Sequence, residues 1–319
     1  MRKELGTFIL LVVLCVVLAI LNPNFLGADN LQNLARLIGI YGIFSIGIGM
    51  VIITGGIDLS VGSVFALLGV LLSIFLVAWH WPAALAVLAV IGIGTFLGLV
   101  NGFLITRVKI QPFIVTLCGL LFYRGAARYI ADDETKGFGA AAGFETLKEM
   151  ATGSLFGIPT PFIILIFIAI IAWVVLHRSV FGRYVFAVGR NETAARYSGI
   201  NSGRVIASVY VICGMLAGIS GVLLSFYTNS ISPSSHGNFY ELYGVAAAVL
   251  GGCSLRGGEG SIVGILIGTV LLLVLPNLVN LLQIPSSLNF AVMGAVILIG
   301  VIVDELLRQR QAGKAVKPS

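Results

Sequence analysis

Few residues in this sequence have the types and spacing that bond chemistry requires. The three histidines, His80, His177 and His236, fall at the ends of apolar runs or in loops. The His-Glu-x-x-His pattern of zinc peptidases, the Gly-x-Ser-x-Gly pattern of serine hydrolases and the Gly-x-x-x-x-Gly-Lys-Ser/Thr phosphate loop are all absent. We therefore expect no catalytic residues, no metal, no cofactor and no ATPase activity in the chain itself.

Polar side chains inside apolar runs could instead contact a polar, uncharged solute along a wet route through the protein. Any one of them is more often a contact between helices or a bond to its own helix backbone. The pathway candidates are Ser45, Thr54, Asp58, Ser60, Ser63, Asn101, Thr116, Asn277, Asn280 and Asn289, with Phe44, Phe65 and Phe113 as aromatic surfaces for stacking.

The segment Thr54–Ser63 could interrupt a helix inside the bundle. Gly55 and Gly56 break the preceding apolar run, and Asp58 then has the position of an N-cap, whose carboxylate accepts bonds from free N–H groups. One interpretation is a capped turn between two spans, which we favour for Asp58 itself. The other is a discontinuous helix that faces a solute pathway, because irregular backbone near a membrane must line protein or water.

A second segment, Gly182–Asn201, predicts a short, self-capped helix in a basic loop. Asn191 has the position of its N-cap and Gly199 that of its C-cap. Glu192 lies in the first turn, and Arg196 follows it at the spacing of a favourable ion pair. The helix is either an ordinary surface helix or a docking element for a cytoplasmic partner. Its residues are Asn191, Glu192, Thr193, Ala194, Ala195, Arg196 and Gly199.

The rest of the chain is too apolar to face water. Of its 319 residues, 58% are hydrophobic and only 10% are charged, whereas a soluble domain is about a quarter charged. Long apolar runs exclude a barrel, so we predict an all-α integral membrane protein, a single transmembrane domain over 1–319 with about ten spanning helices. The eighth run is short, which leaves nine as an alternative. The predicted spans are 5–21, 36–54, 58–78, 83–105, 112–130, 159–177, 205–226, 241–252, 261–281 and 288–304.

The positions of Lys and Arg predict the orientation. If the N-terminus is inside, most of the 19 basic residues fall on inner segments. We therefore expect both termini in the cytoplasm, the acidic loop 131–158 outside, and the basic loop 178–204 with its short helix inside. The net charge of +6 follows from this bias, so we expect no nucleic-acid partner.

Glycines at four-residue spacing favour close helix packing in lipid. Each stripe could serve packing inside the bundle, which is the more frequent role, or an interface between subunits. The stripes are Gly94, Gly98 and Gly102; Gly214 and Gly218; and Gly260, Gly264 and Gly268.

Thr54–Ser63 and Gly182–Asn201 closely resemble motifs in the permease subunits of bacterial ABC importers of the ribose type. So do Val249–Gly264 and, near the N-terminus, Asn22–Phe25 followed by Asn30-Leu31. The resemblance covers nearly the whole chain in order, which is far more specific than one motif. It implies two permease copies, or one copy and a paralogue. These would be bound to cytoplasmic ATP-binding subunits and fed by an extracytoplasmic sugar-binding protein.

The resemblance also implies an activity. It implies import of a monosaccharide, a ribose-like pentose or a hexose, across the bacterial inner membrane by alternating access, with residues 191–199 as the coupling helix in a groove of the ATPase. A branched-chain amino acid permease is the alternative within the same superfamily. An ion-coupled secondary transporter is less favoured, because the span centres contain almost no charge.

Overall fold

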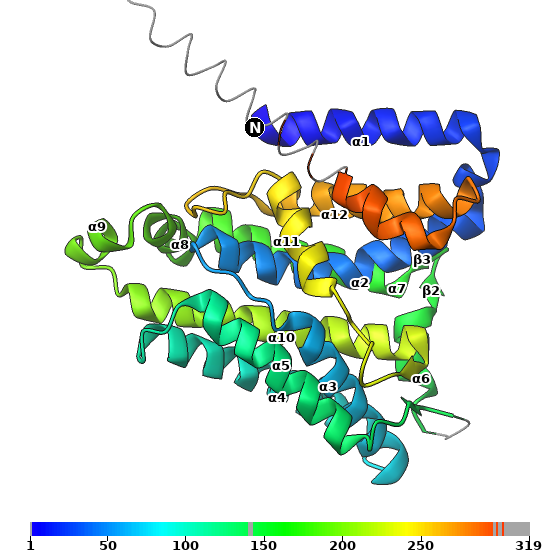
Figure 1. The fold of residues 1–319 in the computed structure, drawn as a ribbon, viewed down its shortest axis with the longest axis horizontal. Helices are drawn as coiled ribbons and strands as arrows, with labels where there is room; N and C mark the ends of the chain where they lie inside the picture. Colours follow the sequence, from blue (N-terminus) through cyan, green and yellow to red (C-terminus); the bar gives the residue numbers. More distant parts are fainter. Residues whose placement is uncertain (1, 140–142, 296–297, 299–301, 303–319) are drawn as a thin grey trace, which may run out of the picture.

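The computed structural model describes residues 2–139, 143–295, 298 and 302 (Figure 1). Helices make up about three quarters of these residues, which confirms the predicted all-α class. In chain order the elements are α1 (Arg2–Leu21), η1 (Pro23–Leu26), α2 (Ala28–Ile53), α3 (Val61–Ser73), η2 (Ile74–Ala78), α4 (Ala83–Thr106), α5 (Pro112–Ile130), β1 (Lys136–Gly137), α6 (Glu145–Thr152), β2 (Ser154–Leu155), β3 (Ile158–Pro159), α7 (Thr160–Trp173), η3 (Val174–Arg178), α8 (Val180–Arg190), α9 (Glu192–Tyr197), α10 (Ser202–Thr228), β4 (Ser230–Ile231), α11 (Tyr240–Leu250), α12 (Ile262–Leu281) and η4 (Ser286–Leu288).

Within the described residues, 8 helical segments are long and apolar enough to cross a membrane. They match the first seven predicted spans and the ninth. The α2 helix begins at Ala28 rather than at 36, because it continues through polar residues that precede the apolar run. The predicted short eighth span is α11, whose 11 residues reach only about 16 Å. Of the predicted last span, 288–304, residues 289–295 are helical, and residues 296, 297, 299–301, 303 and 304 lie outside the described residues.

The α2 helix lies inside the bundle and packs against α7, α10, α11 and α12 (Figure 1). Along one edge of the molecule, α1 packs mainly against α12, and on the other side α10 packs along α4 while α3 packs against α5. At one end α8 and α9 extend from the bundle, and we call this the α9 end. At the opposite end lie α6 and the hairpin formed by β2 and β3, and we call this the hairpin end.

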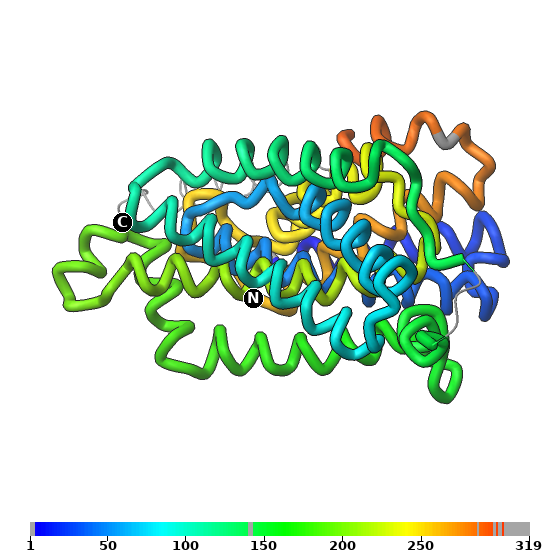
Figure 2. Tube along the Cα trace, turned by 90° about the horizontal axis from the view of Figure 1, so that it is seen from below, coloured from blue at the N-terminus to red at the C-terminus, as the bar shows by residue number. Residues whose placement is uncertain are grey.

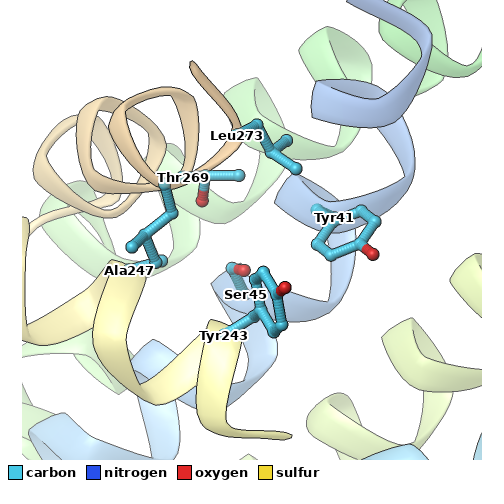
Figure 3. A pocket seen from close by; sticks show the side chains of 7 residues that line it. Tyr41, Ser45, Tyr243, Ala247, Thr269 and Leu273 are labelled. Carbon is cyan, nitrogen blue, oxygen red and sulfur yellow. The ribbon is translucent and has the colours of Figure 1, made fainter. Parts of the chain in front are cut away.

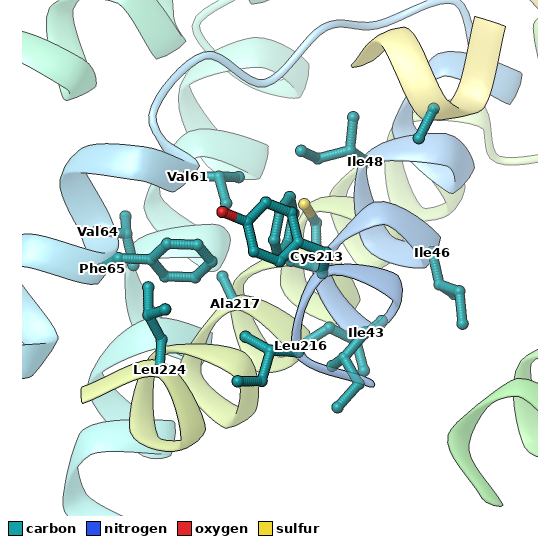
Figure 4. Close-up of a cluster of buried hydrophobic side chains, with 14 of the residues drawn as sticks. Ile43, Ile46, Ile48, Val61, Val64, Phe65, Cys213, Leu216, Ala217 and Leu224 are labelled. Carbon is teal, nitrogen blue, oxygen red and sulfur yellow. The ribbon is translucent and has the colours of Figure 1, made fainter. Parts of the chain in front are cut away.

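The core between α2, α3 and α10 is filled by apolar side chains (Figure 4). Phe65 of α3 lies beside Ala217 and Leu224 of α10, and Ile43 of α2 lies beside Leu216. Lipid tails are as apolar as these side chains, so their association gains little from the hydrophobic effect. Close packing therefore has to hold these helices together.

The glycine stripes bring helix backbones into contact within the chain. A Cβ atom on Gly94 of α4 would lie 2.7 Å from the carbonyl oxygen of Gly214 in α10, and one on Gly98 would collide with the carbonyl oxygen of Tyr210. Gly264 and Gly268 of α12 approach the backbone of α11 and its C-cap in the same way, whereas Gly260, which precedes α12, meets the side chains of Cys253 and Ile53. Of the two interpretations that the sequence left open, internal packing accounts for all three stripes.

Candidate functional site

Asp58 lies in a buried polar network where the chain leaves α2. Ser60 donates to the Asp58 Oδ1 atom from its backbone N at 2.9 Å and from its Oγ at 2.6 Å, and only 3% of Asp58 is exposed. Residues 56–60 stay non-helical, and α3 begins at Val61 with Ser60 in the N-cap position. Ser60 rather than Asp58 therefore occupies the N-cap position of α3, so the N-cap prediction is wrong for Asp58. Its carboxylate instead accepts from the Ser60 backbone N and closes the turn between the two spans, as the favoured interpretation predicted.

Two further helices join this network through neutral polar groups. The Nδ2 of Asn101 in α4 donates to the Oγ of Ser60 at 3.2 Å, and the hydroxyl of Tyr123 in α5 donates to the Oδ1 of Asn101 at 3.3 Å. The hydrogen bonds thus form one series, from the Tyr123 hydroxyl through Asn101 and Ser60 to the Asp58 carboxylate. Buried polar groups satisfied in this way fix the relative positions of the elements that carry them.

The carbonyl of Ile57 is held by two more helices. It accepts a hydrogen bond from the Tyr210 hydroxyl of α10 at 3.2 Å. The Thr116 Oγ1 of α5 lies 3.3 Å from it, and makes its shorter hydrogen bond, at 2.9 Å, to the carbonyl of Pro112 in its own helix. A non-helical backbone inside a membrane bundle needs such partners, since lipid offers none. The sequence identified Thr116 as a candidate, but it gave no sign of Tyr123 or Tyr210.

Arg124 of α5 links parts of the bundle that are far apart in the sequence. Its Nη1 donates to the carbonyls of His236 at 2.7 Å and Pro233 at 3.2 Å, and its Nη2 donates to the carbonyl of Gly62 at 3.3 Å. Its charge is also attracted to the buried carboxylate of Glu241 in the first turn of α11. The guanidinium therefore holds the loop before α11 against the first turn of α3. Arg124, and Arg128 one turn further on, interrupt an otherwise apolar helix, and this was the sequence signal for such a role.

His236 lies in the loop between α10 and α11, outside the spanning segments, and is only 7% exposed. Its Nε2 has no hydrogen-bond partner in the part of the chain that the structure describes. Burial, together with the nearby positive charge of Arg124, lowers the pKa of the imidazole to about 4. The ring is therefore neutral at physiological pH, which avoids a second buried cation beside Arg124.

Ser45 lies apart from this network, in a narrow crevice between α2, α11 and α12 (Figure 3). Tyr41 and Tyr243 lie across the crevice with ring centroids 5.7 Å apart, and Thr269 of α12 adds a second small hydroxyl. Tyr240 extends the aromatic surface, 4.8 Å from Tyr41 between ring centroids. The crevice leaves no room for a water molecule, so it is closed in this conformation.

Several predicted pathway residues join neither group, and Thr54, Phe113 and Asn277 show why. Thr54 donates from its Oγ1 to the carbonyl of Val51, in its own helix, at 2.7 Å. Phe113 is 51% exposed on the surface of α5. Asn277 of α12 donates to the Oδ1 of Asn30 in α2 at 2.6 Å. It therefore links α12 to α2 at a site separate from the Asp58 network and from the crevice. The structure therefore brings together Asp58, Ser60, Asn101 and Thr116, and Ser63 joins them because its Oγ donates to the carbonyl of Ser60 at 2.7 Å.

The predicted short helix is α9, with the predicted caps. The Oδ1 of Asn191 accepts a hydrogen bond from the backbone N of Ala194 at 2.9 Å, which identifies Asn191 as the N-cap. Gly199 follows the helix in the left-handed conformation, with φ +83, and donates to the carbonyl of Arg196. Glycine has no Cβ to oppose this conformation, so it ends the helix at little cost.

The predicted ion pair within α9 is absent from the described residues. The Oε1 of Glu192 instead accepts a hydrogen bond from the Ser202 Oγ at the start of α10, at 2.9 Å. Glu192 thus ties α9 to the following span, and Arg196 lies on the exposed surface with no partner among the residues that the structure describes. Tyr197, 89% exposed, adds an aromatic ring to the same surface.

These features define a class, a multi-pass helical membrane protein whose polar side chains turn inward and whose short helix α9 projects from one end. The chain belongs to the family described as the permease component of branched-chain amino acid transport systems, which matches residues 30–301. As a permease component it is not itself the ATPase of such a system. The resemblance seen in the motifs is confirmed.

Individual relatives cover almost the whole chain. It is 41% identical over 303 residues to the ribose import permease protein of Bacillus subtilis, which covers 95% of this chain and 92% of that protein. It is 38% identical over 301 residues to the ribose import permease protein of Escherichia coli K12, covering 94% and 93%. It is 31% identical over 295 residues to the fructose import permease protein of Rhizobium meliloti, covering 91% and 81%. No solved structure matches the chain.

Proposed function

We propose that this chain is the membrane-spanning subunit of an ATP-driven, binding-protein-dependent importer of a monosaccharide. The observation that carries the proposal is its similarity, over nearly its whole length, to permeases named for ribose, fructose and allose. The family description mentions branched-chain amino acids, but these relatives favour the sugar branch. The amino acid alternative is accordingly not favoured.

We further propose that the α9 end faces the cytoplasm and binds the ATP-binding subunit. The bias of Lys and Arg toward segments at this end supports the orientation, since cytoplasmic loops of membrane proteins are enriched in both. The exposed Arg196 and Tyr197 supply the charged and aromatic surface that docking would use. A second permease copy or a paralogue completes the pathway, and the sugar-binding protein delivers its cargo at the hairpin end.

The crevice at Ser45 supports a place on the sugar route. Tyr41, Tyr243, Ser45 and Thr269 combine hydroxyl groups with aromatic faces, which suit the hydroxyl groups and the apolar faces of a sugar ring. Because the crevice is closed in this conformation, passage requires α2, α11 and α12 to separate. ATP binding and hydrolysis in the partner subunits would drive this separation through α9.

The test is uptake into sealed vesicles by the complex assembled with its ATP-binding and sugar-binding subunits. Labelled pentoses, hexoses and branched-chain amino acids are compared with and without ATP. We expect uptake of one or a few monosaccharides that needs both ATP and the binding protein. Uptake driven by an ion gradient through this chain alone would overturn the proposal, and so would selective uptake of amino acids.

The role of α9 is tested by reversing its exposed charge. Arg196→Glu should reduce the ratio of sugar imported to ATP hydrolysed several-fold. The variant bundle still inserts into the membrane, but movements of the ATP-binding subunit are no longer transmitted to it through α9. Glu192→Gln is a milder companion, since an amide still accepts the hydrogen bond from Ser202. Transport and ATP hydrolysis are measured on the same vesicles.

Lys148→Glu is the matched control for Arg196→Glu. It makes the same charge reversal on an exposed position of a short helix, α6, at the opposite end. We expect its ratio of transport to hydrolysis to stay normal. If Arg196→Glu also left that ratio normal, α9 would not be the coupling helix.

A further inference from the structure

The hairpin of β2 and β3 exposes an apolar surface that no other part of the described chain covers. Leu155 is 56% exposed, Phe156 95% and Ile158 47%. Leu155 pairs with Ile158 across the two strands, so both side chains lie on the same face of the hairpin. Phe156 lies at the tip. Three neighbouring large apolar side chains at the end of a loop are unfavourable in water.

The tip is also unfavourable in its backbone. Phe156 has φ 52 and Gly157 has φ 80, so both central residues of this two-residue turn adopt the left-handed conformation. Turns of this kind favour Asn or Asp followed by Gly, because bulky side chains are strained there. The sequence therefore keeps an aromatic ring where a small polar residue would fold more easily, which points to a use for the ring.

The hairpin is attached directly to a lipid-facing span. Thr160–Arg178 has 19 residues, about 28 Å of helix, which matches the roughly 30 Å hydrocarbon core of a bilayer. At the far end of this span the Arg178 guanidinium lies 5.1 Å from the Trp173 ring, a pairing suited to the membrane interface. If Arg178 marks one interface, Thr160 lies at the other, and residues 154–159 lie within the headgroup layer.

The base of the hairpin is fixed, so its tip has a defined place. Thr160 donates from its backbone N to the carbonyl of Gly153 at 3.1 Å, and Arg36 of α2 donates to the carbonyl of Thr152 at 2.9 Å. In Figure 2 the hairpin, in green beside α6, extends at the edge of the bundle on the side where α7 lies. It points toward the surroundings of α7 and away from the centre of the bundle.

We infer that the hairpin of β2 and β3 inserts Leu155, Phe156 and Ile158 into the boundary between lipid headgroups and acyl chains. The α7 helix exposes Phe167 and Ile170 among other apolar residues, and the hairpin directly precedes this helix in the chain. Aromatic residues favour this depth, and such residues set the tilt and depth of the span they flank. The hairpin thereby anchors one end of α7 in the membrane. This anchoring is a role separate from the proposed transport.

The inference is tested by quenching of tryptophan fluorescence by brominated phosphatidylcholine in nanodiscs. The reporter is Phe156→Trp in a chain whose Trp79, Trp81 and Trp173 are changed to Phe. We expect strong quenching by bromines placed high on the acyl chains. Phe167→Trp supplies the reference for lipid contact, and Glu134→Trp, whose native side chain is 72% exposed in the neighbouring loop, supplies the reference for water.

A second reporter separates lipid contact from misfolding. Leu155→Trp should be quenched with Phe156 present and lose most of that quenching in combination with Phe156→Asn, because Asn fits the turn but not the lipid. If Phe156→Trp is quenched no more than Glu134→Trp, the hairpin lies in water and the inference fails. A blue shift of that unquenched reporter on adding the sugar-binding protein would assign the hairpin to that partner instead.

Discussion

At the scale of single residues, buried polar groups in this protein connect helices. Asp58, Ser60 and Asn101 satisfy one another, and Arg124 satisfies three backbone carbonyls at once. In a membrane bundle each such group would otherwise lie unpaired in a medium without hydrogen-bond donors or acceptors. The networks therefore fix where the non-helical segment 54–60 and the loop before α11 lie.

Arg124→Gln should destabilise the bundle, because the shorter neutral amide cannot reach all three carbonyls and leaves Glu241 without its positive neighbour. The loss of charge-assisted bonds predicts about 2 kcal/mol or more. Thermal unfolding of the purified protein in detergent would show it as a lower midpoint.

Arg128→Gln, one turn further along α5, is the control for Arg124→Gln. Arg128 is exposed, and its ion pair with Asp133 at 2.6 Å is open to solvent. Exposed pairs contribute little, so the midpoint of this variant should stay close to that of the unchanged protein. Equal effects of the two substitutions would contradict the role assigned to Arg124.

At the scale of elements, direct contact between helix backbones at glycines determines which helices are neighbours. α4 and α10 meet along glycines, so their backbones approach more closely than larger residues allow. The short helix α9 follows a different rule, because its ends are set by local caps at Asn191 and Gly199. The positions of α4 and α10 therefore depend on each other, whereas the ends of α9 depend only on residues within α9 and next to it.

Gly98→Ala and Gly92→Ala should have opposite effects on stability, although both lie in α4. The added methyl at Gly98 collides with the backbone carbonyl of Tyr210, which predicts a loss of about 1–3 kcal/mol. At Gly92 nothing lies within 4 Å, so the better helix propensity of alanine predicts a gain of up to about 1 kcal/mol. Unfolding midpoints in detergent measure both. A tolerated Gly98→Ala would mean that α4 and α10 do not meet here.

At the scale of the whole molecule, the structure shows one closed conformation of a protein proposed to alternate between two. Tyr41, Tyr243 and Thr269 close the crevice around Ser45, which is 1% exposed. Because the crevice has no room for even a water molecule, we propose that transport through it requires these helices to move apart. The crevice should therefore open only during turnover.

Ser45→Cys measures this opening. In a chain whose Cys15, Cys118, Cys213 and Cys253 are replaced, the new thiol should react with a water-soluble maleimide several-fold faster when ATP, the ATP-binding subunit and the loaded binding protein are all present. Tyr197→Cys, at an exposed site, should react rapidly in the chain alone, which reports reagent quality, and more slowly once the ATP-binding subunit covers α9. An unreactive Ser45→Cys in actively transporting vesicles would exclude the crevice from the route.

The sequence by itself determined the features that depend on the solvent and on near neighbours along the chain. Apolar runs predicted the spanning helices, because lipid permits no unpaired backbone, and the caps of α9 followed from residues within one turn. The motif blocks likewise indicated the family. These signals are local, so no knowledge of tertiary contacts was needed.

Only the tertiary structure decided which side of each helix faces protein. Lipid and core are both apolar, so hydropathy does not distinguish them: 83% of the apolar window of α2 is buried but only 22% of that of α4. The partners of Arg124, the hydroxyls that hold Ile57 and the exposure of Phe113 all depend on this facing. Such contacts join residues far apart in the sequence, and the folded bundle alone brings them together.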